Sequence, residues 1–174
     1  MPKIRIGISS CLLGEPVRYD GGHKRDQYII DELGRYFELT GVCPEREAGM
    51  PVPRDAMRLA GDAEAPRLVV ICSNQDLTGQ MQTFCDVRVA ELAQLELCGF
   101  VFKGNSPSCG LSQVPVYPLS GDEPLAEGRG LFAAALAARL PEMPMVEDGF
   151  LHEPAHCRAF VARVLQYARH LQED

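Results

Sequence analysis

The stretch GFVFKGNSPSCG, residues 99–110, joins a short apolar segment to a turn that carries several functional groups. The apolar segment, Gly99–Phe102, has the character of a buried strand. Two glycines, a proline and two serines within residues 103–110 exclude a helix and predict a tight, shaped turn. The turn also contains a lysine and a cysteine, which a plain connector does not need. We therefore expect it to belong to a functional site.

Two other cysteines follow predicted strands in the same way. Cys11 comes after a strand predicted at residues 4–8, and Cys43 comes after a strand predicted at residues 37–42. The third cysteine of this kind, Cys109, lies in the turn described above. Because the carboxyl ends of parallel strands meet at one edge of an open α/β sheet, we expect the three thiols to converge there.

The rest of the chain alternates strands with helices. Further strands are predicted at residues 67–72, 114–117 (an edge strand) and 143–146, and helices at residues 27–36, 77–97, 131–140 and 154–172. Residues 47–66 show little periodicity and are expected to wrap over the surface near the site. The alternation predicts an α/β fold: a single-domain three-layer sandwich, residues 1–174, with a mostly parallel, Rossmann-like sheet.

Composition and charge narrow the class of protein. The 174 residues are 46% apolar and 24% charged, which is typical of a globular domain. The net charge is −7 and no cluster of Lys and Arg is present, so a nucleic acid is not an expected partner. The N-terminus does not have the pattern of a signal peptide, and no apolar run approaches the ~18 residues of a membrane span, which predicts a cytoplasmic protein. Seven cysteines in a reducing compartment favour metal or redox use over disulfides.

The three strand-end thiols suit a metal site. Three thiolates can bind zinc together with a fourth ligand, or can hold an iron–sulfur cluster in which one iron stays open to substrate. Composition alone does not choose between these two. Cys72 ends the strand predicted at residues 67–72 and is a reserve fourth ligand, although packing in the core is the favoured interpretation of this residue. The remaining cysteines are interpreted as small buried residues: Cys85, Cys98 and Cys157.

Polar side chains near the thiols are candidates for catalysis. Glu45, two residues after Cys43, can act as a general base beside a metal, and the alternative is an ordinary solvated carboxylate. Lys103 can stabilise a developing anion, to which Ser106 or Ser108 can donate a hydrogen bond. The alternative for both serines is stabilisation of the turn by bonds between side chain and backbone.

Three further segments offer groups that can bind a ligand. In RYDG, residues 18–21, Arg18 and Asp20 can recognise a planar polar ligand, although the segment also suits an ordinary β-turn. Arg54 follows two prolines and is a candidate for binding an anion or a carbonyl oxygen. The segment GRG, residues 128–130, precedes a predicted helix and can present backbone N–H groups to an anion.

As a set, these motifs resemble the thiouracil desulfidase family, from the first strand to about residue 140. The resemblance is carried by SSCLLG (9–14), RYDG (18–21), CPE (43–45), GMPVPR (49–54), KGNSPSCG (103–110) and GRG (128–130). It implies a 4Fe–4S cluster held by Cys11, Cys43 and Cys109, with the fourth iron free to take the sulfur of a thiocarbonyl substrate. It also implies that Glu45 and Ser106 assist the chemistry.

These implications give a functional hypothesis. We expect an iron–sulfur-dependent desulfidase that hydrolyses the C=S group of a thiolated pyrimidine such as thiouracil to the carbonyl and releases sulfide. Glu45 would deprotonate the attacking water, and Ser106 with Lys103 would stabilise the charge. Substrate contacts are expected from Arg18, Asp20, Arg54 and Ser108. Two alternatives stay open: a non-catalytic iron–sulfur or zinc binding or sensor module, and a persulfide carrier that uses Cys109 as its nucleophile.

Overall fold

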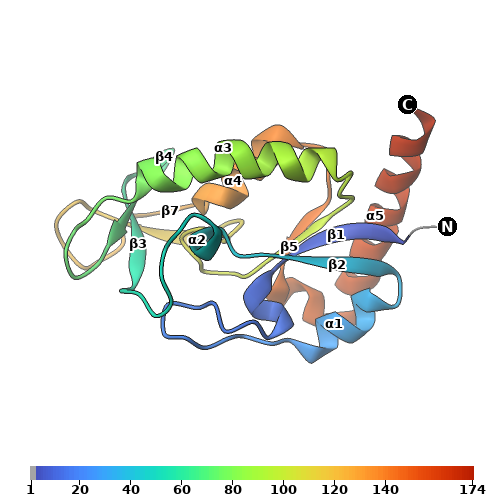
Figure 1. The fold of residues 1–174 in the computed structure, drawn as a ribbon, viewed down its shortest axis with the longest axis horizontal. Coiled ribbons are helices and arrows are strands. Elements are labelled where there is room, and N and C mark those ends of the chain that lie inside the picture. The colour runs from blue at the N-terminus through green and yellow to red at the C-terminus, as the bar shows by residue number, and fades with distance from the viewer. Residues whose placement is uncertain (1–2) are drawn as a thin grey trace.

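The computed structural model describes residues 3–174 and contains a four-stranded sheet whose strands are all parallel. The strands lie in the order β2-β1-β5-β8 (Figure 1). Their bounds are β1 (Ile4–Ser9), β2 (Phe37–Val42), β5 (Phe100–Phe102) and β8 (Met145–Glu147). β1 and β2 pair along their full length, from Ile4 opposite Phe37 to Ser9 opposite Val42. The carboxyl ends of these two strands are therefore level with each other.

Helices cover both faces of this sheet (Figure 1). One face is covered by α3 (Thr78–Gln94) and α4 (Leu131–Arg139), and the other by α1 (Gln27–Gly34) and α5 (Pro154–Glu173). Along β5, Phe100 and Phe102 pack in the core formed with α3 and α4, whereas Val101 packs in the core formed with α1 and α5. Successive side chains of a strand point to opposite faces, so β5 separates two cores. The predicted three-layer α/β fold is confirmed.

A second four-stranded sheet lies at the left end of the molecule in Figure 1. Its strands are β4 (Ala65–Val70), β3 (Met57–Asp62), β6 (Val114–Tyr117) and β7 (Ala126–Gly128), in that order. The prediction that residues 67–72 belong to the parallel sheet was wrong, and so was the prediction that residues 47–66 contain no strand. β3 buries only two consecutive residues, Leu59 and Ala60, so its sequence lacks the alternation that marks a half-buried strand.

The longest helix, α5, is amphipathic and packs one face on the sheet. Its buried residues are Cys157, Phe160, Val161, Val164 and Ala168, which recur at helical spacing. The opposite face carries charged side chains such as Arg158 and Arg169, both exposed. Among residues 3–174, no helix combines the length and the apolar character that a membrane crossing requires.

Each strand of the parallel sheet runs at its carboxyl end into a short turn or helix. These segments are η1 (Ser10–Leu13) after β1, α2 (Pro44–Glu47) after β2, the turn at residues 103–110 after β5, and η2 (Asp148–His152) after β8. Because β2, β1 and β5 are neighbours in the sheet, Cys43, Cys11 and Cys109 come from three adjacent strand ends.

Candidate active site

A cavity of about 380 Å³ lies at the carboxyl ends of β1, β2 and β5. Most of the predicted site residues line it: Cys11, Arg18, Cys43, Glu45, Arg54, Lys103, Ser106 and Cys109. The structure thus brings together side chains that are up to 98 positions apart in the chain, from Cys11 to Cys109. Tyr19 also lines the cavity.

Three candidates lie outside the cavity lining. Asp20 is exposed, and its Oδ1 accepts a hydrogen bond from the N–H of Gly22 at 2.9 Å, as in an ordinary turn. Ser108 is fully buried, and its Oγ has no hydrogen-bond partner among the described residues. The predicted substrate contacts of these two residues gain no support from the geometry. Cys72 follows β4 of the second sheet, is exposed and does not line the cavity, so its prediction as a reserve metal ligand gains no support either.

Cys11 is held by the loop that follows β1. It lies in η1, which ends at Gly14 with a φ of +93°, a left-handed conformation that favours glycine. The carbonyl of Cys11 accepts hydrogen bonds from the N–H groups of Gly14 at 3.2 Å and Lys24 at 2.9 Å. The loop between these two residues therefore closes back onto the cysteine and fixes its backbone.

Cys43 is fixed at the start of α2. Its backbone is extended, and Pro44 occupies the first helical position, where its ring ends the strand and suits the helix. The carboxylate of Glu47 accepts a hydrogen bond from the N–H of Cys43 at 2.7 Å, and the carbonyl of Cys43 accepts one from the N–H of Glu47 at 2.9 Å. These two bonds hold the cysteine from both sides of its backbone.

Ser106 shapes the turn that carries Cys109. Its Oγ accepts hydrogen bonds from the N–H groups of Ser108 at 3.2 Å and Cys109 at 3.0 Å, and its carbonyl accepts one from Gly110 at 2.8 Å. The structure therefore bears out the alternative interpretation of Ser106 as a residue that stabilises the turn. A hydroxyl that accepts two bonds still has its own O–H to donate. Because Ser106 also lines the cavity, that O–H is available to a ligand.

The start of α4 packs directly on this turn. The carbonyl of Ser108 accepts a hydrogen bond from the N–H of Phe132 at 3.0 Å, and the carbonyl of Gly110 accepts one from Gly130 at 2.8 Å. A Cβ at Gly130 would lie 2.5 Å from the carbonyl carbon of Ser108, so only glycine allows this approach. The N–H groups at this helix start are thus bonded to protein, and the prediction that they face an anion was wrong.

Glu45 and Arg54 form a largely buried ion pair at the cavity. The Nε of Arg54 lies 3.3 Å from Oε1 of Glu45, and their side chains are 7% and 17% exposed, respectively. Arg54 also donates hydrogen bonds to the carbonyls of Val17 at 2.9 Å and Pro51 at 3.1 Å. The backbone N–H of Arg54 donates to the carbonyl of Tyr19 at 2.8 Å. Arg54 therefore connects the glutamate to the loop that covers Cys11.

Lys103 is paired with Asp148, which was not among the site residues predicted from the sequence. The Nζ of Lys103 lies 3.3 Å from Oδ2 of Asp148, whose Oδ1 accepts a hydrogen bond from the N–H of Gly104 at 2.9 Å. The next carboxylate, Glu147, accepts a hydrogen bond from the N–H of Leu111 at 3.0 Å. Glu147 and Asp148 could have been found from their position directly after the last predicted strand, because this position lies at the same edge of the sheet as the thiols.

Burial raises the pKa of all three cavity thiols, most strongly that of Cys109. For Cys11, the charge of Arg18 and then that of Lys103 lower the pKa and partly offset this effect. For Cys109, a hydrogen bond with Ser9 lowers the pKa, whereas the charges of Glu45 and then of Cys11 and Cys43 raise it further, because negative charges in one cavity repel one another. Metals bind the thiolate form, so a bound cation would remove the cost of ionising these groups.

The three thiols surround the cavity without meeting at one point. Among residues 3–174, no three His, Cys, Asp or Glu side chains are grouped closely enough to hold a single metal ion. The thiols line one cavity and come from separate strand ends. The three thiols therefore share one cavity, as expected, but they do not lie close enough together to bind one metal ion.

Comparisons with known proteins identify a family and two relatives of the chain. The sequence model of the family described as 2-thiouracil desulfurase matches residues 6–148. A relative from Bacillus subtilis (strain 168), called uncharacterized protein YbbK, is 29% identical over 139 residues, which cover 75% of this chain and 88% of that one. A solved structure described as the 4Fe-4S-dependent thiouracil desulfidase TudS is 28% identical, with a TM-score of 0.67, over 90% of this chain and 99% of the other.

Proposed function

Because the chain belongs to the 2-thiouracil desulfurase family, we propose that it is a desulfidase that replaces the sulfur of a thiocarbonyl on a pyrimidine-like ring with oxygen. The observation that carries this proposal is the set of three buried or half-buried thiols that three neighbouring strand ends direct to one cavity. The solved relative described as a 4Fe-4S-dependent thiouracil desulfidase supports the same chemistry. Thiouracil is therefore the substrate to test first.

The donor set of the cavity fits a 4Fe–4S cluster. Its lining, as far as residues 3–174 show, contains three cysteines, no fourth cysteine and no histidine. We propose that Cys11, Cys43 and Cys109 would hold such a cluster and leave one iron without a protein ligand. Arg18 and Lys103, whose charges already act on Cys11, would offset the negative charge of the thiolates. When bound, the cluster would supply a Lewis acid for the sulfur of the substrate.

Glu45 is the proposed general base. Its carboxylate lines the cavity and is held at Oε1 by Arg54, 3.3 Å away. In this role Glu45 takes a proton from water, whose oxygen then forms the new bond to the thiocarbonyl carbon. The C–S bond breaks, the oxygen becomes the new carbonyl, and the sulfur leaves as sulfide with the protons of the water.

Arg54 is proposed to position Glu45 rather than to bind substrate as expected. Its guanidinium already contacts Glu45 and the carbonyls of Val17 and Pro51, and its side chain is only 7% exposed. A group with these partners has little capacity left for a ligand. It instead fixes the direction of the carboxylate.

Ser106 and Lys103 are proposed to stabilise the negative charge that develops on the oxygen. Both line the cavity, Ser106 with a free O–H and Lys103 with an ammonium group. Fixed donors of this kind contribute up to ~10²–10³ in rate each, because they need no reorganisation during the reaction. Arg18, which also lines the cavity, is proposed to contact the polar edge of the substrate.

The experiment that tests this function measures iron, acid-labile sulfide and turnover of 2-thiouracil in anaerobically purified protein. About four iron and four sulfide per chain are expected, with release of sulfide during turnover. Cys109→Ala should lose the cluster and all turnover. The matched control is Cys85→Ala, because Cys85 is equally buried but lies in α3 outside this cavity, and it should keep both.

Other outcomes assign the protein to a different class. Zinc in place of iron, or activity that persists without iron, would refute the proposed chemistry. A complete cluster without turnover of any thiolated pyrimidine would point to the non-catalytic binding or sensor module. Activity in iron-free protein that depends on Cys109 would point to the persulfide carrier.

A further inference from the structure

We propose that Asp148, at the end of β8, positions the ammonium group of Lys103 for the reaction, an inference that rests on the function proposed above. Asp148 does not line the cavity, and its hydrogen bond and its ion pair are made to the turn of Lys103. It directly follows β8, the fourth strand of the parallel sheet, which lies next to β5, the strand that leads into the turn of Lys103.

One carboxylate holds both the backbone and the side chain at the start of the turn. Oδ1 of Asp148 accepts the hydrogen bond from the N–H of Gly104 at 2.9 Å, and Oδ2 lies 3.3 Å from the Nζ of Lys103. The two side chains of the ion pair are 21% and 16% exposed, so solvent screens them only partly.

Lys103 needs such a partner because its charge sits at the end of a flexible stem. A lysine has four methylene groups and loses rotamer freedom when it is fixed, whereas the planar fork of an arginine loses less of it for each hydrogen bond that it forms. Its other contact, from Nζ to the carbonyl of Gly104, is long at 3.5 Å. Asp148 is therefore the main group that determines where the ammonium lies.

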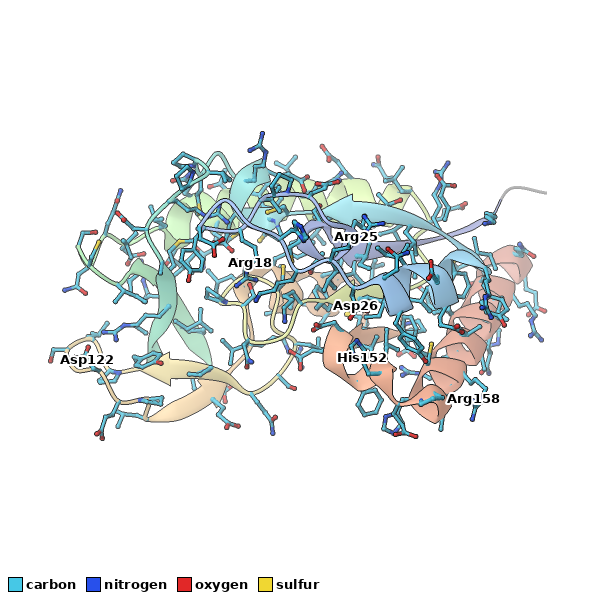
Figure 2. The ribbon with its side chains drawn as sticks, turned by 90° about the horizontal axis from the view of Figure 1, so that it is seen from below. Arg18, Arg25, Asp26, Asp122, His152 and Arg158 are labelled. Carbon is cyan, nitrogen blue, oxygen red and sulfur yellow. The ribbon has the colours of Figure 1, made fainter. Side chains whose placement is uncertain are left out.

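Asp148 itself is held in place by the segment around it. It begins η2, whose last residue, His152, contacts Asp26 with Nε2 2.5 Å from Oδ2. Figure 2 shows these two side chains beside each other, where η2 meets the start of α1. The N–H of Asp26 in turn donates to the carbonyl of Leu12 at 2.9 Å. The ion pair of Asp148 with Lys103 and the loop of Cys11 are thus connected through η2 and the start of α1.

Glu147 provides a matched comparison. Its Oε2 accepts a hydrogen bond from the N–H of Leu111 at 3.0 Å, much as Asp148 accepts one from Gly104. Within the described part of the chain, however, Glu147 makes no ion pair. Changing each carboxylate to its amide keeps an oxygen acceptor for the backbone N–H and removes only the charge. A difference between the two variants therefore reports the pairing with Lys103.

The test is a double-mutant cycle in the iron-loaded enzyme with 2-thiouracil as substrate. Asp148→Asn should lower kcat about tenfold, a loss of ~1.4 kcal/mol in transition-state stabilisation, and leave KM and iron content unchanged. Glu147→Gln should keep the kcat of the wild type. In a Lys103→Met background, Asp148→Asn should add less than about a twofold loss, because the group it positions is gone.

A second readout does not depend on turnover. In metal-free protein, the shifts in melting temperature caused by Asp148→Asn and Lys103→Met should be less than additive in the double variant. Additive effects in both cycles, or equal losses of kcat in Asp148→Asn and Glu147→Gln, would overturn the proposal. A wild type that holds a cluster but turns over no substrate would refute the proposed function instead, and the metal-free cycle would still decide whether Asp148 holds Lys103.

Discussion

Replacing Gly130 by alanine tests how closely α4 must pack on the turn of Cys109. The backbone of Gly130 has φ −57° and ψ 147°, which alanine adopts without strain, so any effect comes from space. The added Cβ would lie 2.5 and 2.6 Å from the carbonyl carbon and oxygen of Ser108, and 2.8 Å from the nitrogen of Cys109. Ordinary contacts begin at 3.4 Å, so the helix start and the turn must separate by about 1 Å.

The size of the effect follows from what this separation strains. The atoms in contact belong to the backbone, so no side chain can rotate away, and overpacking of this kind costs ~1–3 kcal/mol. The N–H groups of Gly130, Phe132 and Ala133 donate hydrogen bonds to carbonyls of the turn, and these bonds would lengthen as well. Each is worth ~0.5–1.5 kcal/mol. We expect a total loss of about 3 kcal/mol in the free energy of unfolding. The displaced thiol of Cys109 should also reduce the iron bound per chain.

The assay is urea unfolding of metal-free protein under reducing conditions, with iron content measured separately after anaerobic reconstitution. Gly79→Ala in α3 is the control, because no atom lies within 4 Å of the position that its methyl group would take and alanine favours a helix by ~0.5–1 kcal/mol. Gly79→Ala should therefore unfold at a higher urea concentration than the wild type, and Gly130→Ala at a lower one. A Gly130→Ala protein with the urea midpoint and iron content of the wild type would refute the reasoning.

Two further predictions concern the buried ion pair. Glu45→Gln should keep the iron content and lower kcat ~10²–10⁴-fold, measured as sulfide release from 2-thiouracil, and full activity would exclude Glu45 as the base. Arg54→Met should lower the free energy of unfolding in urea by about 3 kcal/mol as well as kcat, because it leaves Glu45 and the carbonyls of Val17 and Pro51 without their partner. A stable, active Arg54→Met protein would show that Arg54 does not position Glu45.

The parallel sheet and its site edge were predictable because local patterns decide them. β5 is a short apolar run, β1 and β2 begin by alternating apolar with polar residues, and Gly or Pro follows closely after Cys11, Cys43 and Cys109. In a parallel sheet, the carboxyl ends of the strands lie at one edge, so the sequence alone predicted that the three thiols that follow these ends lie near one another. The second sheet was not predictable in this way. β3 buries only Leu59 and Ala60, and its partners β4 and β6 are chosen by tertiary packing.

Asp148 was missed for a related reason. It bonds to Gly104 from 44 positions further along the chain, and no local spacing relates the two residues. Ser106 shows the opposite case, because its bonds to Ser108 and Cys109 span two and three positions and follow from ordinary turn chemistry. Side chains that shape one turn can be read from sequence, whereas those that hold two strand ends together depend on the order of strands in the sheet.

That order also suits the proposal that one iron of the cluster would have no protein ligand. Across β2-β1-β5-β8, the strand ends supply Cys43, Cys11, the turn of Cys109, and then Asp148. The fourth strand end thus supplies no thiol, and its carboxylate pairs with Lys103 without lining the cavity. If the Asp148→Cys variant held a cluster but lost turnover of 2-thiouracil, the added thiol would have taken the place of the substrate as the fourth ligand of the cluster. If instead turnover fell only as far as in Asp148→Asn, the fourth strand end would lie too far from the cluster to act as a ligand, and its role would be confined to Lys103.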